Sequence, residues 1–121
     1  MERVRFLTHQ GKQILLIDYS GCTRQTVLDI LKERERIVLA QPPGSVLTLV
    51  DVTGVETNKQ VFDEVKKVAV RERAIVKRAA VVGIESVPKV LFESLKTFAA
   101  REYRTFATRE EAMDWLVKEE D

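Results

Sequence analysis

Residues 46–70 read VLTLVDVTGVETNKQVFDEVKKVAV, and the spacing of their apolar residues indicates a strand followed by a helix. Its opening run, VLTLV, is almost entirely apolar and predicts a strand at 46–50 that is covered on both faces. Thr57 and Gln60 have the spacing of a capping box, which predicts that a helix begins there. Apolar residues then recur at three- and four-residue spacing and give that helix one buried stripe. The stripe consists of Val61, Phe62, Val65, Val68 and Ala69.

The alternation of strand and helix continues toward the C-terminus. Residues 79–83, AAVVG, predict a strand whose small side chains suit a crowded sheet centre. A helix is expected from 86, with Pro88 in its first turn, where a missing N–H costs nothing. Residues 103–107 predict a further strand, and a capping box at Thr108 and Glu111 opens a last helix. The expected buried faces are Leu91, Phe92, Leu95, Phe98 and Ala99, then Ala112, Trp115 and Leu116.

Toward the N-terminus the pattern begins with a hairpin. Residues 4–8 and 13–19 are rich in strand-forming residues and flank the turn signal Gln10-Gly11-Lys12. Thr23 opens a helix, and the PPG at 42–44 forms a loop before the strand at 46–50. The apolar side of that helix is expected to hold Val27, Leu28, Leu31, Val38 and Leu39. The order β-β-α-β-α-β-α-β-α predicts an α/β domain over 1–121, with a five-stranded, mostly parallel sheet and one antiparallel edge strand.

The overall charge gives no sign of a nucleic-acid partner. The 121 residues carry 20 Lys and Arg against 19 Asp and Glu, a net charge of +1, so no strong field attracts nucleic acid or lipid. No apolar run approaches the roughly 20 residues that cross a bilayer, and the N-terminus has no signal-peptide pattern. A single cysteine, Cys22, allows no internal disulfide. We therefore expect a cytoplasmic protein without membrane insertion.

Charge is nevertheless uneven along the chain. Basic residues outnumber acidic ones by 7 to 3 between Lys59 and Arg78, and acidic residues outnumber basic ones by 6 to 2 from Arg109 onward. Two solvated helix faces account for this pattern. Pairing of the two segments between copies, as a homodimer, is the alternative that stays open.

Side chains suited to catalysis are sparse. His9, the only histidine, is placed in the hairpin turn, so no base is near Cys22 and a structural role is expected for the thiol. One His and one Cys cannot make a Cys/His zinc set, and the sequence has no glycine-rich phosphate loop. Asp51 ends a buried strand, but the other acidic, hydroxyl and lysine positions of a response-regulator receiver are missing. Asp51 is therefore interpreted as a loop-organising carboxylate that accepts backbone N–H groups. We expect no enzymatic activity, cofactor or metal.

Several stretches resemble one family. They are LVDVTG at 49–54, RAAVVG at 78–83, YRTF at 103–106 and EEAMDWL at 110–116. These are similar to the SpoIIAA-like family, which is related to the STAS domains of bacterial anti-sigma factor antagonists and shares a fold with CRAL-TRIO lipid-transfer domains. The resemblance implies a regulatory or protein-interaction module with a protein partner. A carrier of small apolar ligands or lipids is the alternative.

The resemblance also points to a phosphorylation site. In the antagonists, a serine in an Asp-Ser-Ser-Gly motif is phosphorylated near the start of the helix that follows the third strand. The corresponding stretch here, DVTGVETN at 51–58, lacks that motif. Thr57 is the nearest positional match and Thr53 the next. Thr57 is also expected at a helix N-cap, a role that explains a threonine without any modification.

Polar and glycine residues follow two neighbouring predicted strands. In a parallel sheet the carboxyl ends of the strands meet the N-termini of the helices at one edge, where ligands commonly bind. Gly21 and Gly54 would let a partner approach the backbone closely. We predict that a protein or ligand touches this edge. The candidate residues are Asp51, Thr53, Gly54, Thr57, Asn58, Ser20, Gly21 and Thr23.

Overall fold

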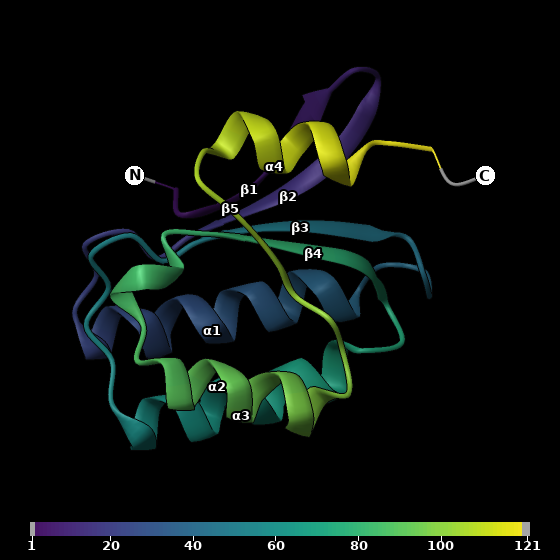
Figure 1. Ribbon diagram of the computed structural model, residues 1–121. Coiled ribbons are helices and arrows are strands. Elements are labelled where there is room, and N and C mark those ends of the chain that lie inside the picture. Colours follow the sequence, from purple (N-terminus) through teal and green to yellow (C-terminus); the bar gives the residue numbers. More distant parts are fainter. Residues whose placement is uncertain (1, 120–121) are drawn as a thin grey trace.

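A computed structural model of the chain describes residues 2–119 and contains the expected alternation of strands and helices (Figure 1). The strands form one five-stranded sheet with the order β1-β2-β3-β4-β5. The pair β1–β2 is antiparallel and the other three pairs are parallel, as predicted. The strands are β1 (Val4–His9), β2 (Lys12–Asp18), β3 (Val46–Asp51), β4 (Val76–Val82) and β5 (Arg104–Phe106). The helices are α1 (Arg24–Leu39), α2 (Lys59–Glu72), η1 (Ile84–Ser86, a 3₁₀ turn), α3 (Lys89–Ala99) and α4 (Arg109–Leu116).

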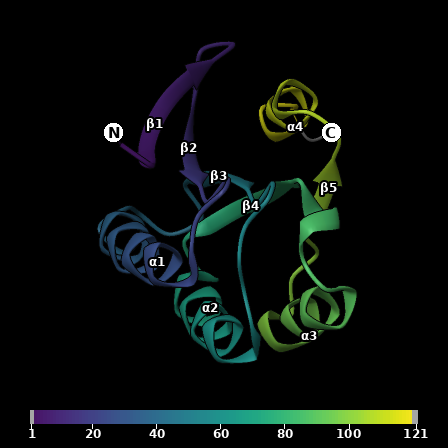
Figure 2. The ribbon, with the colours of Figure 1, turned by 90° about the vertical axis from the view of Figure 1, so that its left-hand side faces the viewer.

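The strand order places the first three α-helices on one face of the sheet (Figure 2). Each parallel connection steps to the next strand in the same direction. Because such crossovers are right-handed, helices α1, α2 and α3 must then lie on the same side. Only α4, which follows the last strand, covers the opposite face, where it lies over β3 and β4.

The residues of β2 show why this sheet is buried from both sides. Leu15 and Ile17 belong to the core beneath α1 and α2, whereas Ile14 and Leu16 belong to the core beneath α4. All four are at most 2% exposed. A consecutive apolar run of this kind is what a strand between two layers requires.

Three boundaries differ from the sequence prediction. The N-cap of α2 is Asn58, not Thr57, because the Asn58 side chain accepts the Val61 N–H at 2.9 Å. The strand expected from 79 already begins at Val76. The helix expected from 86 is preceded by the 3₁₀ turn, and Pro88 is its N-cap. The capping box at Thr108 is confirmed, since its hydroxyl accepts the Glu111 N–H at 3.2 Å.

Two predicted core residues lie at the surface instead. Phe98 is 56% exposed and Leu39 is 45% exposed. Phe98 is at the border of the buried stripe of α3, which is centred on Leu95 and Ala99, and the Lys66 ammonium lies over its ring. Leu39 is in the last turn of α1, where the helix leaves the sheet. Within residues 2–119, the helices are all too short or too polar to cross a membrane.

Candidate functional site

The predicted edge is built from two loops that touch each other. The loops, residues 19–23 after β2 and residues 52–58 after β3, are called the edge loops below. The Gly21 N–H donates to the Thr53 carbonyl at 2.8 Å, and the Glu56 N–H donates to the Cys22 carbonyl at 2.9 Å. These backbone bonds join the loops into one surface. The structure therefore brings the candidate residues of the two loops together.

Most polar groups of the edge loops are already hydrogen-bonded. The Asp51 carboxylate accepts the Thr53 N–H at 3.0 Å, which is the loop-organising role interpreted from the sequence. Ser20 donates its hydroxyl to Asp18 at 2.6 Å. Thr23 caps α1 by accepting the Thr26 N–H at 3.3 Å. The loops are thus ordered by their own bonds, while Gly21, Thr23, Thr53 and Gly54 remain exposed.

The segment that follows β4 also holds the loop after β3 in place. Gly83, the residue after β4, has a φ of 81°, and a Cβ on it would lie 2.2 Å from the Thr53 hydroxyl oxygen. Only glycine permits both that backbone conformation and that close approach. The Ser86 hydroxyl oxygen accepts the Gly54 N–H at 2.7 Å. The position of Thr53 and Gly54 is therefore set by the β4 terminus as well as by the edge loops.

The two carboxylates at this edge are paired with two arginines. Arg109, the first residue of α4, places its Nε 2.8 Å from Asp51 Oδ2 and its Nη2 3.3 Å from Asp18 Oδ1. Arg3 Nη1 lies 3.6 Å from the same Asp18 oxygen, so the two carboxylates are balanced by two guanidinium groups. Burial acts to raise the pKa of Asp18, but the hydrogen bonds from Ser20 and the charges of the two arginines together hold that pKa below its usual range. The sequence pattern did not reveal Arg109, because this residue was assigned only to the N-terminus of an acidic helix.

One candidate residue of the edge, Thr57, does not have the expected role, and the neighbouring Cys22 is buried. Thr57 is half-buried, and its hydroxyl makes only a long contact of 3.5 Å to the Asn58 carbonyl. Prediction of Thr57 as an N-cap was wrong because the adjacent Asn58 takes that position. Cys22 is 3% exposed, and burial raises the pKa of its thiol. Low exposure and a raised pKa both disfavour a reactive thiolate.

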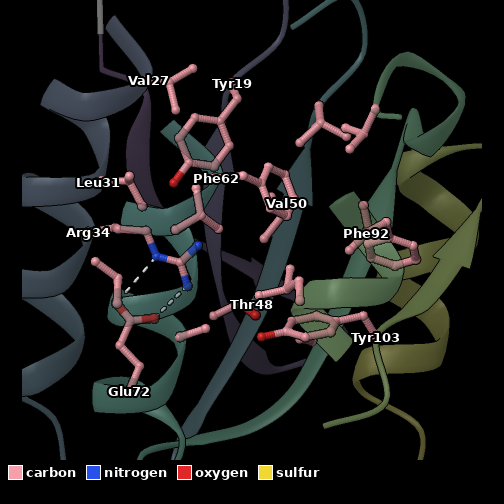
Figure 3. Close-up of a pocket in the computed structure, with 18 of the residues that line it drawn as sticks. Tyr19, Val27, Leu31, Arg34, Thr48, Val50, Phe62, Glu72, Phe92 and Tyr103 are labelled. Carbon is pink, nitrogen blue, oxygen red and sulfur yellow. Dashed lines mark hydrogen bonds and ion pairs between the residues drawn. The ribbon is translucent and has the colours of Figure 1, made fainter. Parts of the chain in front are cut away.

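Beneath the edge loops lies a cavity between the sheet and helices α1, α2 and α3 (Figure 3). Its volume is about 90 Å³, and its walls are mostly aliphatic and aromatic. Val52, Val55 and Thr57 line it from the second edge loop. The cavity and the exposed edge therefore share one segment of chain. The sequence pattern does not reveal this cavity, because most of its lining residues are apolar core residues drawn from several helices, strands and loops.

A buried ion pair forms the polar side of this cavity. Arg34 of α1 donates from Nη2 and Nε to the two Glu72 oxygens of α2, at 2.6 and 3.3 Å. The side chains are 13% and 2% exposed. Burial acts to lower the pKa of Arg34, but the neighbouring Glu72 carboxylate outweighs it and raises that pKa, so the guanidinium stays charged. The pair holds α1 and α2 in one register over the cavity.

Tyr19 extends from the first edge loop into the same cavity (Figure 3). The residue is 5% exposed, and burial raises the pKa of its hydroxyl. Among the residues that the structure describes, none makes a hydrogen bond of ordinary geometry to this hydroxyl. The Arg34 guanidinium is the nearest polar group, and its charge and its hydrogen-bonding contact with the Tyr19 oxygen act to lower that pKa, although burial outweighs them. Within residues 2–119, no cluster of three His, Cys, Asp or Glu side chains could hold a metal ion.

Comparisons with known proteins identify the fold. No family model matches the sequence, and no curated protein matches it. The structure is similar to that of an uncharacterized protein from the DUF3478 family with a SpoIIAA-like fold, from Shewanella loihica PV-4. The TM-score is 0.72 at 17% sequence identity, and the match covers 93% of this chain and 91% of the other. The strand order and the parallel pairing agree with that description. The chain therefore has a SpoIIAA-like fold.

Proposed function

We propose that this chain is a STAS-type interaction module that binds a protein partner at the edge loops and acts by binding, without catalysis. The observation that carries the proposal is the pair of cross-loop hydrogen bonds, Gly21 to Thr53 and Glu56 to Cys22. They join two loops into one ordered surface whose outer residues are exposed. A surface that is ordered beforehand loses little conformational entropy when a partner binds, which favours affinity.

The electrostatics of the edge support recognition by shape and hydrogen bonding. The two carboxylates of the edge are balanced by two guanidinium groups. A highly charged ligand would thus find no excess charge to pair with. Backbone and hydroxyl groups at Gly21, Thr53 and Gly54 offer short-range hydrogen bonds to a protein surface. If the partner is released by phosphorylation, Thr53 is the residue a kinase can reach, because Thr57 is half-buried.

The proposal is tested with one substitution on the edge and one away from it. Thr53→Arg places a long charged side chain on the proposed contact surface. Thr8→Arg makes the same change at an exposed residue of β1, whose end lies at the opposite edge of the sheet. Partners are isolated with tagged protein from its own cells and quantified by mass spectrometry. We expect Thr53→Arg to lose a specific partner about tenfold and Thr8→Arg to retain it.

The same isolation also tests the homodimer. If the recovered partner is a second copy of the chain, native mass spectrometry of the purified protein will show a dimer that Thr53→Arg converts to monomer. Equal recovery of every partner by wild type and both variants would place the contact surface elsewhere and refute the proposal.

A carrier of apolar ligands or lipids ranks second. The cavity supports binding of some molecule, since its walls are mostly apolar. Its volume of about 90 Å³ is, however, well below the roughly 300–1,000 Å³ of pockets for drug-sized ligands. A lipid chain does not fit this arrangement of the helices, so any ligand must be much smaller.

A further inference from the structure

Polar and apolar side chains both line the cavity (Figure 3). Tyr19, Arg34 and Glu72 contribute polar groups, and Thr48 and Tyr103 contribute two further hydroxyls. The rest of the lining is mostly aliphatic and phenyl side chains. Such a lining suits a molecule that has an apolar body and a polar atom at one end.

The Tyr19 hydroxyl is the feature that points to a ligand. It is buried, it extends into the cavity, and no described residue makes a hydrogen bond of ordinary geometry to it. Its polar neighbour, the Arg34 guanidinium, can only donate, so the hydroxyl proton of Tyr19 has no acceptor among the described residues. A buried polar group without a partner is unfavourable, and native proteins contain few of them. Phenylalanine would fill the same volume without a buried hydroxyl, so the tyrosine requires an explanation. A hydrogen bond from this hydroxyl to a bound molecule would explain it.

Arg34 restricts the chemistry of that molecule. Its two bonds to Glu72 start from Nε and Nη2, and neither uses Nη1. Arginine can only donate, so a ligand atom near it must accept. The charge of Arg34 is already balanced by Glu72, so an ionised ligand would enter an apolar space without a counter-charge. The ligand is therefore neutral and offers an acceptor atom.

Cavity volume restricts the size of the molecule. A cavity of about 150 Å³ holds benzene, which has six heavy atoms. In proportion, the volume of about 90 Å³ here corresponds to a molecule of about four heavy atoms. A small ketone, aldehyde or alcohol has this size.

We propose that the cavity beneath the edge loops is a binding site for a small, neutral, oxygen-bearing organic molecule, whose oxygen accepts a hydrogen bond from Tyr19. This site is separate from the protein-contact surface, so either proposal can fail without the other. Val52, Val55 and Thr57 bring the two within one segment of chain.

The test compares two molecules of one shape. Propanone and 2-methylpropene have four heavy atoms each and differ by exchange of the carbonyl oxygen for a CH₂ group. Each is titrated into the protein while the methyl NMR signals of Leu31 and Val50, which line the cavity, are followed. The exposed Val90 serves as reference. Because the carbonyl oxygen loses its hydration in the cavity and the alkene does not, the quantity compared is the change that a substitution makes in the affinity for each molecule.

Two variants test whether Tyr19 recognises the oxygen. Tyr19→Phe should weaken ketone binding about tenfold and leave alkene binding unchanged, because only the hydroxyl is removed. Thr48→Val removes a different hydroxyl from the cavity wall, one that donates to the Arg78 carbonyl at 3.5 Å, and should leave the affinity for both molecules unchanged. Thermal melts verify that both variants are folded. In the wild type, an NOE from the ketone methyl to the Tyr19 ring protons tests the same contact without a substitution.

Three results would overturn the site. An equal change in ketone and alkene affinity on Tyr19→Phe would show an apolar cavity without polar recognition. Undiminished ketone binding in Tyr19→Phe would assign recognition of the oxygen to another group. No change at Leu31 and Val50 at high concentrations of either molecule would show that the cavity admits no organic ligand.

Discussion

The Arg34–Glu72 pair gives the sharpest test of how this fold is held together. It crosses from α1 to α2 with two hydrogen bonds, and Glu72 is only 2% exposed. We consider three variants: Arg34→Met, Glu72→Met, and the double substitution. Methionine retains much of the length of both side chains and adapts to irregular space. The variants therefore remove charge with little loss of volume.

The expected magnitudes follow from the burial of the pair. Each single substitution leaves an uncompensated charge in the core, which should lower the free energy of unfolding by about 3–5 kcal/mol. The double variant removes both charges, so its loss should be about 2 kcal/mol or less and smaller than either single loss. This non-additivity is the signature of direct coupling between the two side chains.

Urea denaturation followed by circular dichroism measures these differences. With an m-value of about 1.5 kcal/mol per molar urea, a single substitution should move the midpoint by about 2–3 M. Arg71 and Glu35 offer a matched control, because they also pair across α1 and α2 but are more exposed. Removing that pair should change the midpoint very little. If the losses of Arg34→Met and Glu72→Met simply add in the double variant, the buried pair does not couple the helices as argued.

Three further predictions concern the edge loops and the end of β2 beside them. Asp18→Asn should lower the free energy of unfolding at neutral pH. Because the pKa of Asp18 is lowered in the folded protein, this difference should be present above about pH 4 and vanish as the pH falls through the folded pKa. A difference that persists at pH 2 in urea titrations would contradict the assignment. Asn58→Ala should lower the free energy of unfolding by about 1 kcal/mol, because it removes the N-cap of α2, and Thr57→Val should lower it less. The reverse order in thermal melts would restore Thr57 as the cap. Cys22 should react with iodoacetamide much more slowly in the native protein than in urea, because its thiol is buried and burial raises its pKa. Equal reaction rates, measured by mass spectrometry, would show an exposed thiol.

The periodicity of the sequence was sufficient for the fold, because strand and helix each have their own spacing of apolar residues. It could not settle the start of α2, where Thr57 and Asn58 are adjacent and both residue types cap helices well. Whether Thr57 or Asn58 is the N-cap depends on which helix start lets Val61 and Phe62 reach the core. Packing of the whole domain sets that position, and the local sequence does not. Local pattern alone therefore places this helix within one residue of its true start.

The polar side of the cavity was missed for a different reason. Arg34 follows Leu31 by three residues and Glu72 follows Val68 by four, so both charged residues occupy positions of the apolar stripes. A charged residue at an apolar position of a helix can indicate a buried ion pair. Taken alone, however, it indicates only that the apolar face of the helix ends there. Only when the two helices are seen side by side do the two charged positions become one ion pair. The Tyr19 hydroxyl is likewise unremarkable until its surroundings are known.

The one-sided arrangement of the helices has a consequence for synthesis of the protein. Three helices on the first face are encoded before residue 100, but α4, which covers Ile14, Leu16 and Leu49 on the second face, is encoded last. Arg109, which pairs with Asp18 and Asp51, arrives with it. Because domains are made from the N-terminus onward, a nascent chain that has folded its first layer still exposes an apolar sheet face. Synthesis and docking of α4 then complete the core and the edge together.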